Sequence, residues 1–133
     1  MNNTKNCFEI YQIKDEINAG TTEFQNRCFA SMNEIKSLGL KADNINEYYY
    51  TCVYSGTFTD KINTAAKRNE MLAKLFHTFN INHPVDYRGR SVSVSDIIVL
   101  KYGDKISAYF VDSVEFVKLK KFFSEKKQGE VTE

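Results

Sequence analysis

The stretch RGRSVSVSDIIVLKYGDKISAYFVD, residues 88–112, decides the fold of this chain. Its first part alternates serine and valine, and the β-branched, apolar run over 97–101 is typical of a strand buried on both faces. Residues 102–105, YGDK, have the composition of a tight hairpin turn, and residues 106–111 supply the returning strand. The sequence therefore predicts an antiparallel hairpin, which the upstream segments cover.

Length and charge narrow the class of protein before any motif is considered. The chain has 133 residues, the size of one domain, and 42% of them are hydrophobic, enough for a single packed core. With 18 basic and 17 acidic residues, it lacks the charge excess of a general nucleic-acid binder and the acidity of a DNA mimic. No apolar run suggests a signal peptide or a membrane helix, so we expect a cytoplasmic protein without membrane contact.

The spacing of the cysteines and glycines is not typical of a metal site or a cofactor site. Cys7, Cys28 and Cys52 lie far apart and form no C-x-x-C pair, so we expect reduced, buried thiols. The six glycines are scattered, and none belongs to a phosphate-binding loop. We therefore predict no metal and no cofactor.

Two segments before the hairpin have the pattern of a strand followed by a helix. Residues 7–14 alternate in polarity and predict the first strand. Apolar side chains then recur at helical spacing and predict a helix over 22–38. Thr22 is its expected N-cap, and Gly39 is the expected left-handed residue after its end.

A second strand and helix follow. Aromatic and β-branched residues over 48–54 predict a strand that ends at Ser55-Gly56, with at least one of its three tyrosines at the surface. Thr59 or Asp60 is the expected cap of a helix that runs to Phe79, with Asn80 left-handed behind it. Its expected apolar face consists of Ile62, Ala65, Ala66, Leu72, Phe76 and Phe79.

These elements together predict an α+β domain. We expect a small, mainly antiparallel sheet of four to five strands with two main helices packed on it, in the order β-α-β-α-β-β. Residues 114–119 are predicted as a short strand or a docking arm. A flexible N-terminus over 1–6 and a basic, polar tail over 120–133 flank a single domain over 7–119.

The sequence offers no convincing catalytic group. His77 has the setting of a solvated helix residue, and His83 precedes the only proline, where an imidazole often contacts backbone carbonyls. Ser93 or Ser95 with His83 would be the only hydrolase arrangement, and no G-x-S-x-G elbow accompanies it. We therefore predict a protein that is not an enzyme.

The arginine loop is the strongest candidate for recognition. Arg88 and Arg90 flank Gly89 near Asp86 and Asp96, which predicts ion pairs that hold the loop, with a patch for carboxylate or phosphate as the alternative. A neighbouring tyrosine and one surplus tyrosine of the second strand are further anchors of the kind that interfaces favour. The predicted binding residues are Tyr87, Arg88, Arg90, Ser93, Ser95, Asp96 and Tyr49.

Four segments also resemble the YodL-like domain family. They are FEIYQIK at 8–14, YTCVYSG at 50–56, FNINHPVDYRGRSVSVSDIIVL at 79–100 and AYFVDSVEF at 108–116. They occur in this order over most of residues 7–119, and the third is long enough to be specific. The chain departs from the family pattern at Glu115, where a glycine is usual before the final phenylalanine.

The resemblance implies an accessory domain of conjugative elements, prophages and plasmids that has no established enzymatic activity. We accordingly expect a protein that binds and inhibits a host protein, such as a defence nuclease, in the manner of anti-CRISPR or antirestriction proteins. One alternative is a nucleic-acid-binding module that uses Arg88, Arg90 and the basic residues 118–127. A second is a modulator of the actin-like cell-shape machinery, with which one namesake of the family is associated. Monomer and homodimer both remain open.

Overall fold

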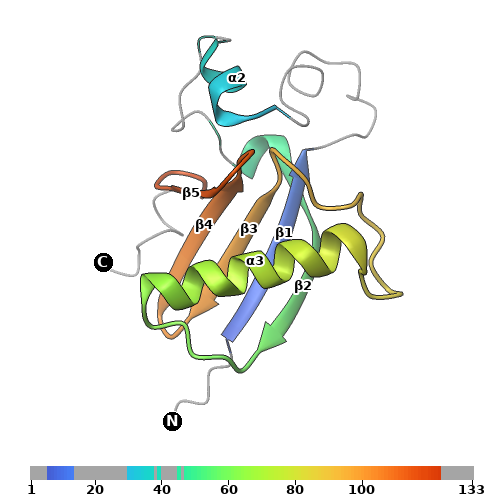
Figure 1. Cartoon of the computed structure of the whole chain (residues 1–133), viewed down its shortest axis with the longest axis vertical. Coiled ribbons are helices and arrows are strands. Elements are labelled where there is room, and N and C mark those ends of the chain that lie inside the picture. Colours follow the sequence, from blue (N-terminus) through green and yellow to red (C-terminus); the bar gives the residue numbers. More distant parts are fainter. Residues whose placement is uncertain (1–5, 14–29, 38, 40–44, 46, 124–133) are drawn as a thin grey trace.

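The centre of the fold is an antiparallel sheet of five strands, in the order β2-β1-β3-β4-β5 (Figure 1). The computed structural model describes residues 6–13, 30–37, 39, 45 and 47–123. The strands are β1 (Asn6–Ile13), β2 (Tyr50–Phe58), β3 (Ile97–Tyr102), β4 (Lys105–Val111) and β5 (Phe116–Leu119). The other described elements are helix α2 (Met32–Ser37), the 3₁₀ turn η2 (Glu47–Tyr49) and helix α3 (Ala65–Ile81). The predicted α+β class and the predicted antiparallel sheet are both confirmed.

The predicted hairpin is present and lies inside the sheet. β3 pairs with β4 across the two-residue turn Gly103–Asp104, and Gly103 takes a φ of 59°. A positive φ at the first turn position is what a type II′ hairpin turn requires. β1 pairs with β3 and β5 pairs with β4, so other strands cover both sides of the hairpin.

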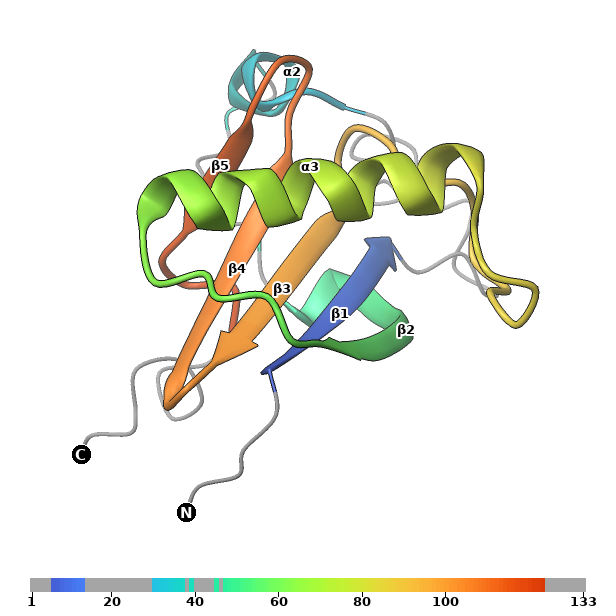
Figure 2. The same cartoon turned by 60° about the horizontal axis from the view of Figure 1, so that its bottom comes forward.

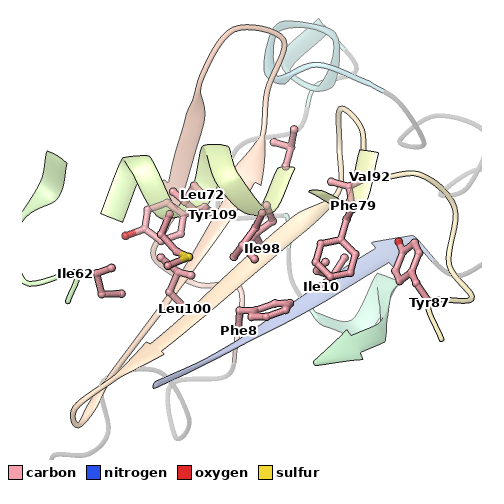
Figure 3. Packing of buried hydrophobic residues seen from close by; sticks show 13 residues of the cluster. Phe8, Ile10, Ile62, Leu72, Phe79, Tyr87, Val92, Ile98, Leu100 and Tyr109 are labelled. Atoms are coloured by element: carbon pink, nitrogen blue, oxygen red, sulfur yellow. The ribbon is translucent and has the colours of Figure 1, made fainter. Parts of the chain in front are cut away.

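Helix α3 crosses one face of the sheet and forms the first core with it (Figure 2). Its buried residues are Met71, Leu72, Leu75 and Phe79, which recur at helical spacing. Figure 3 shows Leu72 and Phe79 above the sheet side chains Phe8, Ile10, Ile98, Leu100 and Tyr109. The predicted face was partly wrong, because Ala65 and Ala66 are exposed and Phe76 is only half-buried.

The ends of α3 differ from the prediction. Thr64 caps the start, and its side chain accepts a hydrogen bond from Lys67 N at 3.1 Å. The helix therefore begins several residues after Thr59 and Asp60, while Ile62 is buried ahead of it. Asn80 remains within the helix and donates its side-chain amide to Val92 O at 2.7 Å, which ties the helix end to the next loop.

A second core fills the opposite face of the sheet. Ile97, Val99, Ala108 and Phe110 point to this side and join Met32 and Ile35 of α2 in one cluster. Because Ile98 and Leu100 belong to the first core, β3 is buried on both faces, as predicted. Phe122 and Phe123 are buried in the second core, so the packed part of the chain continues past the predicted boundary at residue 119. The remainder of the predicted tail, 124–133, lies outside the described residues.

The prediction of one helix over 22–38 was wrong, because residues 30 and 31 are not helical and α2 begins at Met32; residues 22–29 lie outside the described part. Ser31 caps α2, because its Oγ accepts from Glu34 N at 3.2 Å and Glu34 Oε1 accepts from Ser31 N at 2.8 Å. The sequence analysis overlooked this capping box. Thr22, the predicted cap, lies outside the described residues. Gly39 has the predicted left-handed conformation, with a φ of 84°.

β2 begins later and ends later than predicted. Tyr48 and Tyr49 belong to η2, and β2 continues through Gly56 to Phe58. Gly56 lies opposite Phe8, and a Cβ at this position would approach Phe8 Cε1 to 2.7 Å. The glycine therefore makes room for a ring packed against the strand and does not end it. Cys52 is exposed on this strand and Cys7 is half-buried, contrary to the prediction of buried thiols, while Cys28 lies outside the described residues.

Candidate functional site

The predicted recognition residues lie in the loop that joins α3 to β3, residues 82–96. Two tight turns shape this loop. The first runs from Pro84 to Tyr87 and is closed by Tyr87 N donating to Pro84 O at 3.0 Å. The second runs from Ser93 to Asp96 and is closed by Asp96 N donating to Ser93 O at 3.1 Å. The loop is therefore folded back on itself along much of its length.

Gln12 fastens this loop to the end of β1. Its Oε1 accepts from Arg90 N at 2.9 Å, and its Nε2 donates to Arg90 O at 2.8 Å and to Asp96 Oδ2 at 3.0 Å. One buried amide thus satisfies both backbone groups of Arg90 and one side chain of the second turn. The loop is thus joined to β1 through hydrogen bonds of one side chain and not through a strand ladder.

Asp96 is the buried acid of this network and is only 2% exposed. Its Oδ2 also accepts from Ser93 N at 3.0 Å. Burial raises the pKa of Asp96 to about 7, although the hydrogen bonds from Ser93 and Gln12 and the charge of Arg90 act to lower it. This carboxyl group therefore changes its charge near neutral pH.

Ser95 takes a conformation that normally favours glycine. Its φ is 84°, at the third position of a turn that in type II geometry calls for glycine. Its carbonyl accepts a hydrogen bond from Tyr50 OH at 2.7 Å, and its N–H donates to Val111 O at 2.9 Å. Contacts to β2 and β4 hold this strained residue in place.

Tyr87 closes the network from the other side. Its hydroxyl donates to Arg90 O at 2.5 Å, and its ring packs on Phe79 with the ring centroids 5.1 Å apart. Burial raises the pKa of Tyr87 to about 12. Gly89 is required beside it, because a Cβ there would lie 2.6 Å from Tyr87 Oη and 2.8 Å from Gln12 Oε1.

The arginines do not form the expected pairs with the neighbouring aspartates. Arg88 is exposed and donates from Nη1 to Val85 O at 2.9 Å, while Asp86 accepts from Tyr54 OH at 3.1 Å. Arg90 directs Nη2 to Ile13 O at 3.3 Å. The prediction that Arg88 and Arg90 form ion pairs with Asp86 and Asp96 was therefore wrong, and hydrogen bonds to backbone and tyrosine hold these residues.

Burial divides the predicted binding residues into two groups. Tyr87, Ser95 and Asp96 are buried, and Ser93 is half-buried with an enclosed hydroxyl, so these side chains shape the loop from within. Arg88 is exposed, and Tyr49 is half-buried in η2. The outer side of the loop also carries Val85, which is 95% exposed, and Ile81 at the end of α3 is 67% exposed.

The hydrolase arrangement is not assembled in the part of the chain that the structure describes. His83 is exposed, with Nδ1 3.3 Å from Pro84 O and its ring against Tyr87 at 5.1 Å, as expected for a structural histidine. Its contacts are thus to the first turn and not to Ser93 or Ser95. Among the described residues no cluster of His, Cys, Asp or Glu could hold a metal ion.

Gln12 was the functional residue that the sequence analysis did not single out. The sequence did contain a signal. Phe8, Ile10 and Gln12 share one face of the strand, and Phe8 and Ile10 on this face are apolar. A polar side chain in such a position must find partners inside the protein. Sequence alone gave no indication that those partners lie about eighty residues away.

Comparison with known proteins gives one family. The model of the YodL-like domain matches residues 7–122, which include β2 to β5 and β1 from its second residue on. Neither a curated protein nor a solved structure matches the chain. Among the described helices, none has both the length and the apolar character needed to cross a bilayer.

Proposed function

The chain belongs to the YodL-like domain family, and from this premise we propose that it is a non-enzymatic accessory protein of a mobile genetic element. In this proposal it acts in the cytoplasm, where it binds a host protein and inhibits it. The expected partner is a defence nuclease, of the kind that anti-CRISPR and antirestriction proteins block. The family resemblance supports the setting, and the surface of the 82–96 loop supports the mode of action.

One observation carries the proposal: the loop is fixed on its inner side and presents apolar and cationic groups on its outer side. Gln12 and Tyr87 both bond to Arg90, while Val85 and Arg88 point to solvent. A surface that is ordered before binding loses little conformational entropy on association. An exposed valine beside an exposed arginine matches the apolar contact and the charged contact that protein interfaces combine.

Arg88 is positioned for an acidic group on the partner. Its guanidinium is held near the backbone of Val85, since Nη1 donates to Val85 O at 2.9 Å. Arginine retains several further donors in a planar fork, which suits a carboxylate. A stable complex needs about 800 Å² of buried surface on each partner, so the loop would be the anchor of a larger interface.

The first prediction is that charge reversal at Arg88 abolishes capture and leaves the fold intact. Wild type, Arg88→Glu and Val85→Glu are used as baits in host lysate, with Lys118→Glu on β5 as a matched exposed control. We expect one host protein that wild type and Lys118→Glu enrich, and that both loop variants enrich at least tenfold less. That protein, once purified, should form a complex with wild type and lose its activity in it.

Two results would contradict the proposal. One is that no enriched protein depends on Val85 or Arg88, although all variants unfold at the wild-type midpoint. The other is that the Arg88→Glu protein no longer folds, which would make this arginine structural. Capture of an actin-like cell-shape protein would support binding through the loop and would replace the defence nuclease as the expected partner. Binding to nucleic acid through Arg88, Arg90 and 118–127 would appear as a salt-sensitive mobility shift, with host-protein capture absent.

A further inference from the structure

A pocket of about 380 Å³ lies at the start of α3, at the opposite end of the helix from the 82–96 loop. Three segments distant in sequence line it: Asn6 of β1, residues 61–63 with Arg68, and the turn residues 102–105. Figures 1 and 2 show the β3–β4 turn on the same side of the molecule as the beginning of α3. Its volume lies within the usual range for small-molecule sites.

The lining of this pocket is positively charged. It contains three cationic side chains, Lys61, Arg68 and Lys105, and one acidic side chain, Asp104. The first turn of α3 contains no acidic residue, although a negative charge is favoured there. Cations from the helix start and from the hairpin turn therefore share one space without a matching number of carboxylates.

Arg68 is held in position at the pocket. Its Nη1 donates to Ile62 O at 3.1 Å, and its guanidinium carbon lies 5.5 Å from the centre of the Tyr102 ring. A backbone acceptor on one side and an aromatic face on the other restrict its movement. The guanidinium is thus ordered in advance, and its remaining donors can serve a bound anion.

The two pocket lysines differ from lysines nearby. Lys101 pairs with Glu9 at 3.0 Å and Lys74 pairs with Asp60 at 3.7 Å, and neither lysine lines this pocket. Within the described part of the chain, Lys61 and Lys105 form no ion pair. The neighbouring cations are thus compensated within the protein, whereas the pocket cations remain available for a ligand.

We infer that this pocket binds a phosphate monoester, a compact group with two negative charges. Three cations that line one pocket match a dianion better than a single carboxylate, and the fork of Arg68 suits phosphate oxygens. A nucleic-acid strand would require cations arranged along its path, whereas these three surround one space. The inference concerns a surface separate from Arg88 and Val85 and does not depend on the proposed partner.

A titration followed by NMR amide shifts tests the inference on the full chain. The probes are inorganic phosphate, adenosine monophosphate and adenosine, in low-salt buffer without other multivalent anions. We expect saturable shifts with both phosphate-bearing probes, centred on Lys61, Arg68 and Gly103, and none with adenosine. Absence of saturable binding by phosphate and by the monophosphate would overturn the inference.

Matched variants show whether the pocket cations are responsible. Lys61→Gln/Lys105→Gln should weaken binding of adenosine monophosphate at least tenfold, whereas Lys118→Gln on β5 should remain within twofold of wild type. Arg88→Glu should also bind the monophosphate normally, which separates this test from the test of partner capture. Equal weakening in Lys118→Gln, or tighter binding of a single-stranded oligonucleotide without a terminal phosphate, would refute a phosphomonoester site. The thermal midpoint of each variant confirms that it is folded.

Discussion

The two ends of α3 differ in whether the charged and polar side chains around them have partners within the protein. Beyond its C-terminal end, the buried amide of Gln12 and the buried carboxyl of Asp96 bond to one another and to the backbone of the 82–96 loop. At its N-terminal end, Lys61 and Lys105 line an open pocket in which acidic groups are outnumbered. The first end is held together by its polar groups, and the second is left with excess positive charge.

This contrast shows why a conspicuous motif need not be a binding site. The sequence RGRSVSVSD resembles a cluster of ligand-binding groups, yet the carboxyl of Asp96 and the backbone of Arg90 are bonded inside the protein, to Ser93 N and to Gln12. The pocket cations belong to no motif, because the fold collects them from separate segments. Only the exposed side of the loop, with Val85 and Arg88, remains for recognition.

The largest expected effect comes from removing the amide that joins loop and sheet. Gln12→Leu deletes three hydrogen bonds and leaves Asp96 and the backbone of Arg90 buried without these partners. We expect the free energy of unfolding to fall by about 3 kcal/mol, since each unsatisfied buried group costs roughly 1–3 kcal/mol. Urea unfolding measures this change. Arg88→Gln, in the same loop but exposed, should stay within about 0.5 kcal/mol of wild type.

A loss below about 0.5 kcal/mol in Gln12→Leu would mean that the loop does not depend on this amide. Gly89→Ala offers an independent check, because its Cβ would meet Tyr87 Oη at 2.6 Å and displace the same network without removing any polar group. Destabilisation in both variants would assign the effect to the network itself and not to one side chain.

A smaller change in stability is expected over each pH unit, and it arises from one group of the loop, Asp96. Asp96 has a pKa of about 7 in the folded protein against an ordinary value of 3.8. Between these values the folded protein keeps a proton that the unfolded chain releases, so rising pH favours unfolding. The stabilisation is complete below about pH 4 and is lost as pH rises through about 7, at about 1 kcal/mol per pH unit within that window.

The matching control for the pH prediction is Asp96→Asn, which mimics the neutral acid. Urea unfolding at pH 5, 6, 7 and 8 should show declining stability in wild type and a flatter profile in the variant. Asp96 is the ionisable group that differs between the two proteins, so the difference between the two profiles isolates its contribution. Parallel profiles would show that Asp96 is already ionised across this range.

The fold was largely predictable because its central strands obey simple periodicity. The apolar run at Ile97–Leu100 and the glycine of the turn at 103 are local signals, and both predicted what the structure has. The predicted ends of strands were wrong where a contact with a residue distant in sequence determines them. Gly56 reads as a strand end, but the ring of Phe8 on β1 requires a glycine within the strand.

The sequence singled out the 82–96 loop as the candidate site and could not show how it is packed. The positions of Arg90 and Asp96 depend on hydrogen bonds to Gln12, which is distant in sequence. Burial of Tyr87 and Asp96 follows from that tertiary contact, and no local pattern encodes it. The pocket at the start of α3 was missed for the same reason, since Arg68 reads as an ordinary polar residue of the helix.

The smallest predicted effect concerns the pocket and has the opposite sign to the others. Cations close together without matching acids repel one another, so Lys61→Gln/Lys105→Gln should stabilise the ligand-free protein. We expect the thermal midpoint to rise by about 2 °C in phosphate-free buffer of low ionic strength. Phosphate should then raise the midpoint of wild type and leave that of the variant unchanged, because a ligand stabilises only a protein that binds it. A double variant that melts below wild type in both buffers would show that the two lysines support the fold, and the contrast between the ends of α3 would fail.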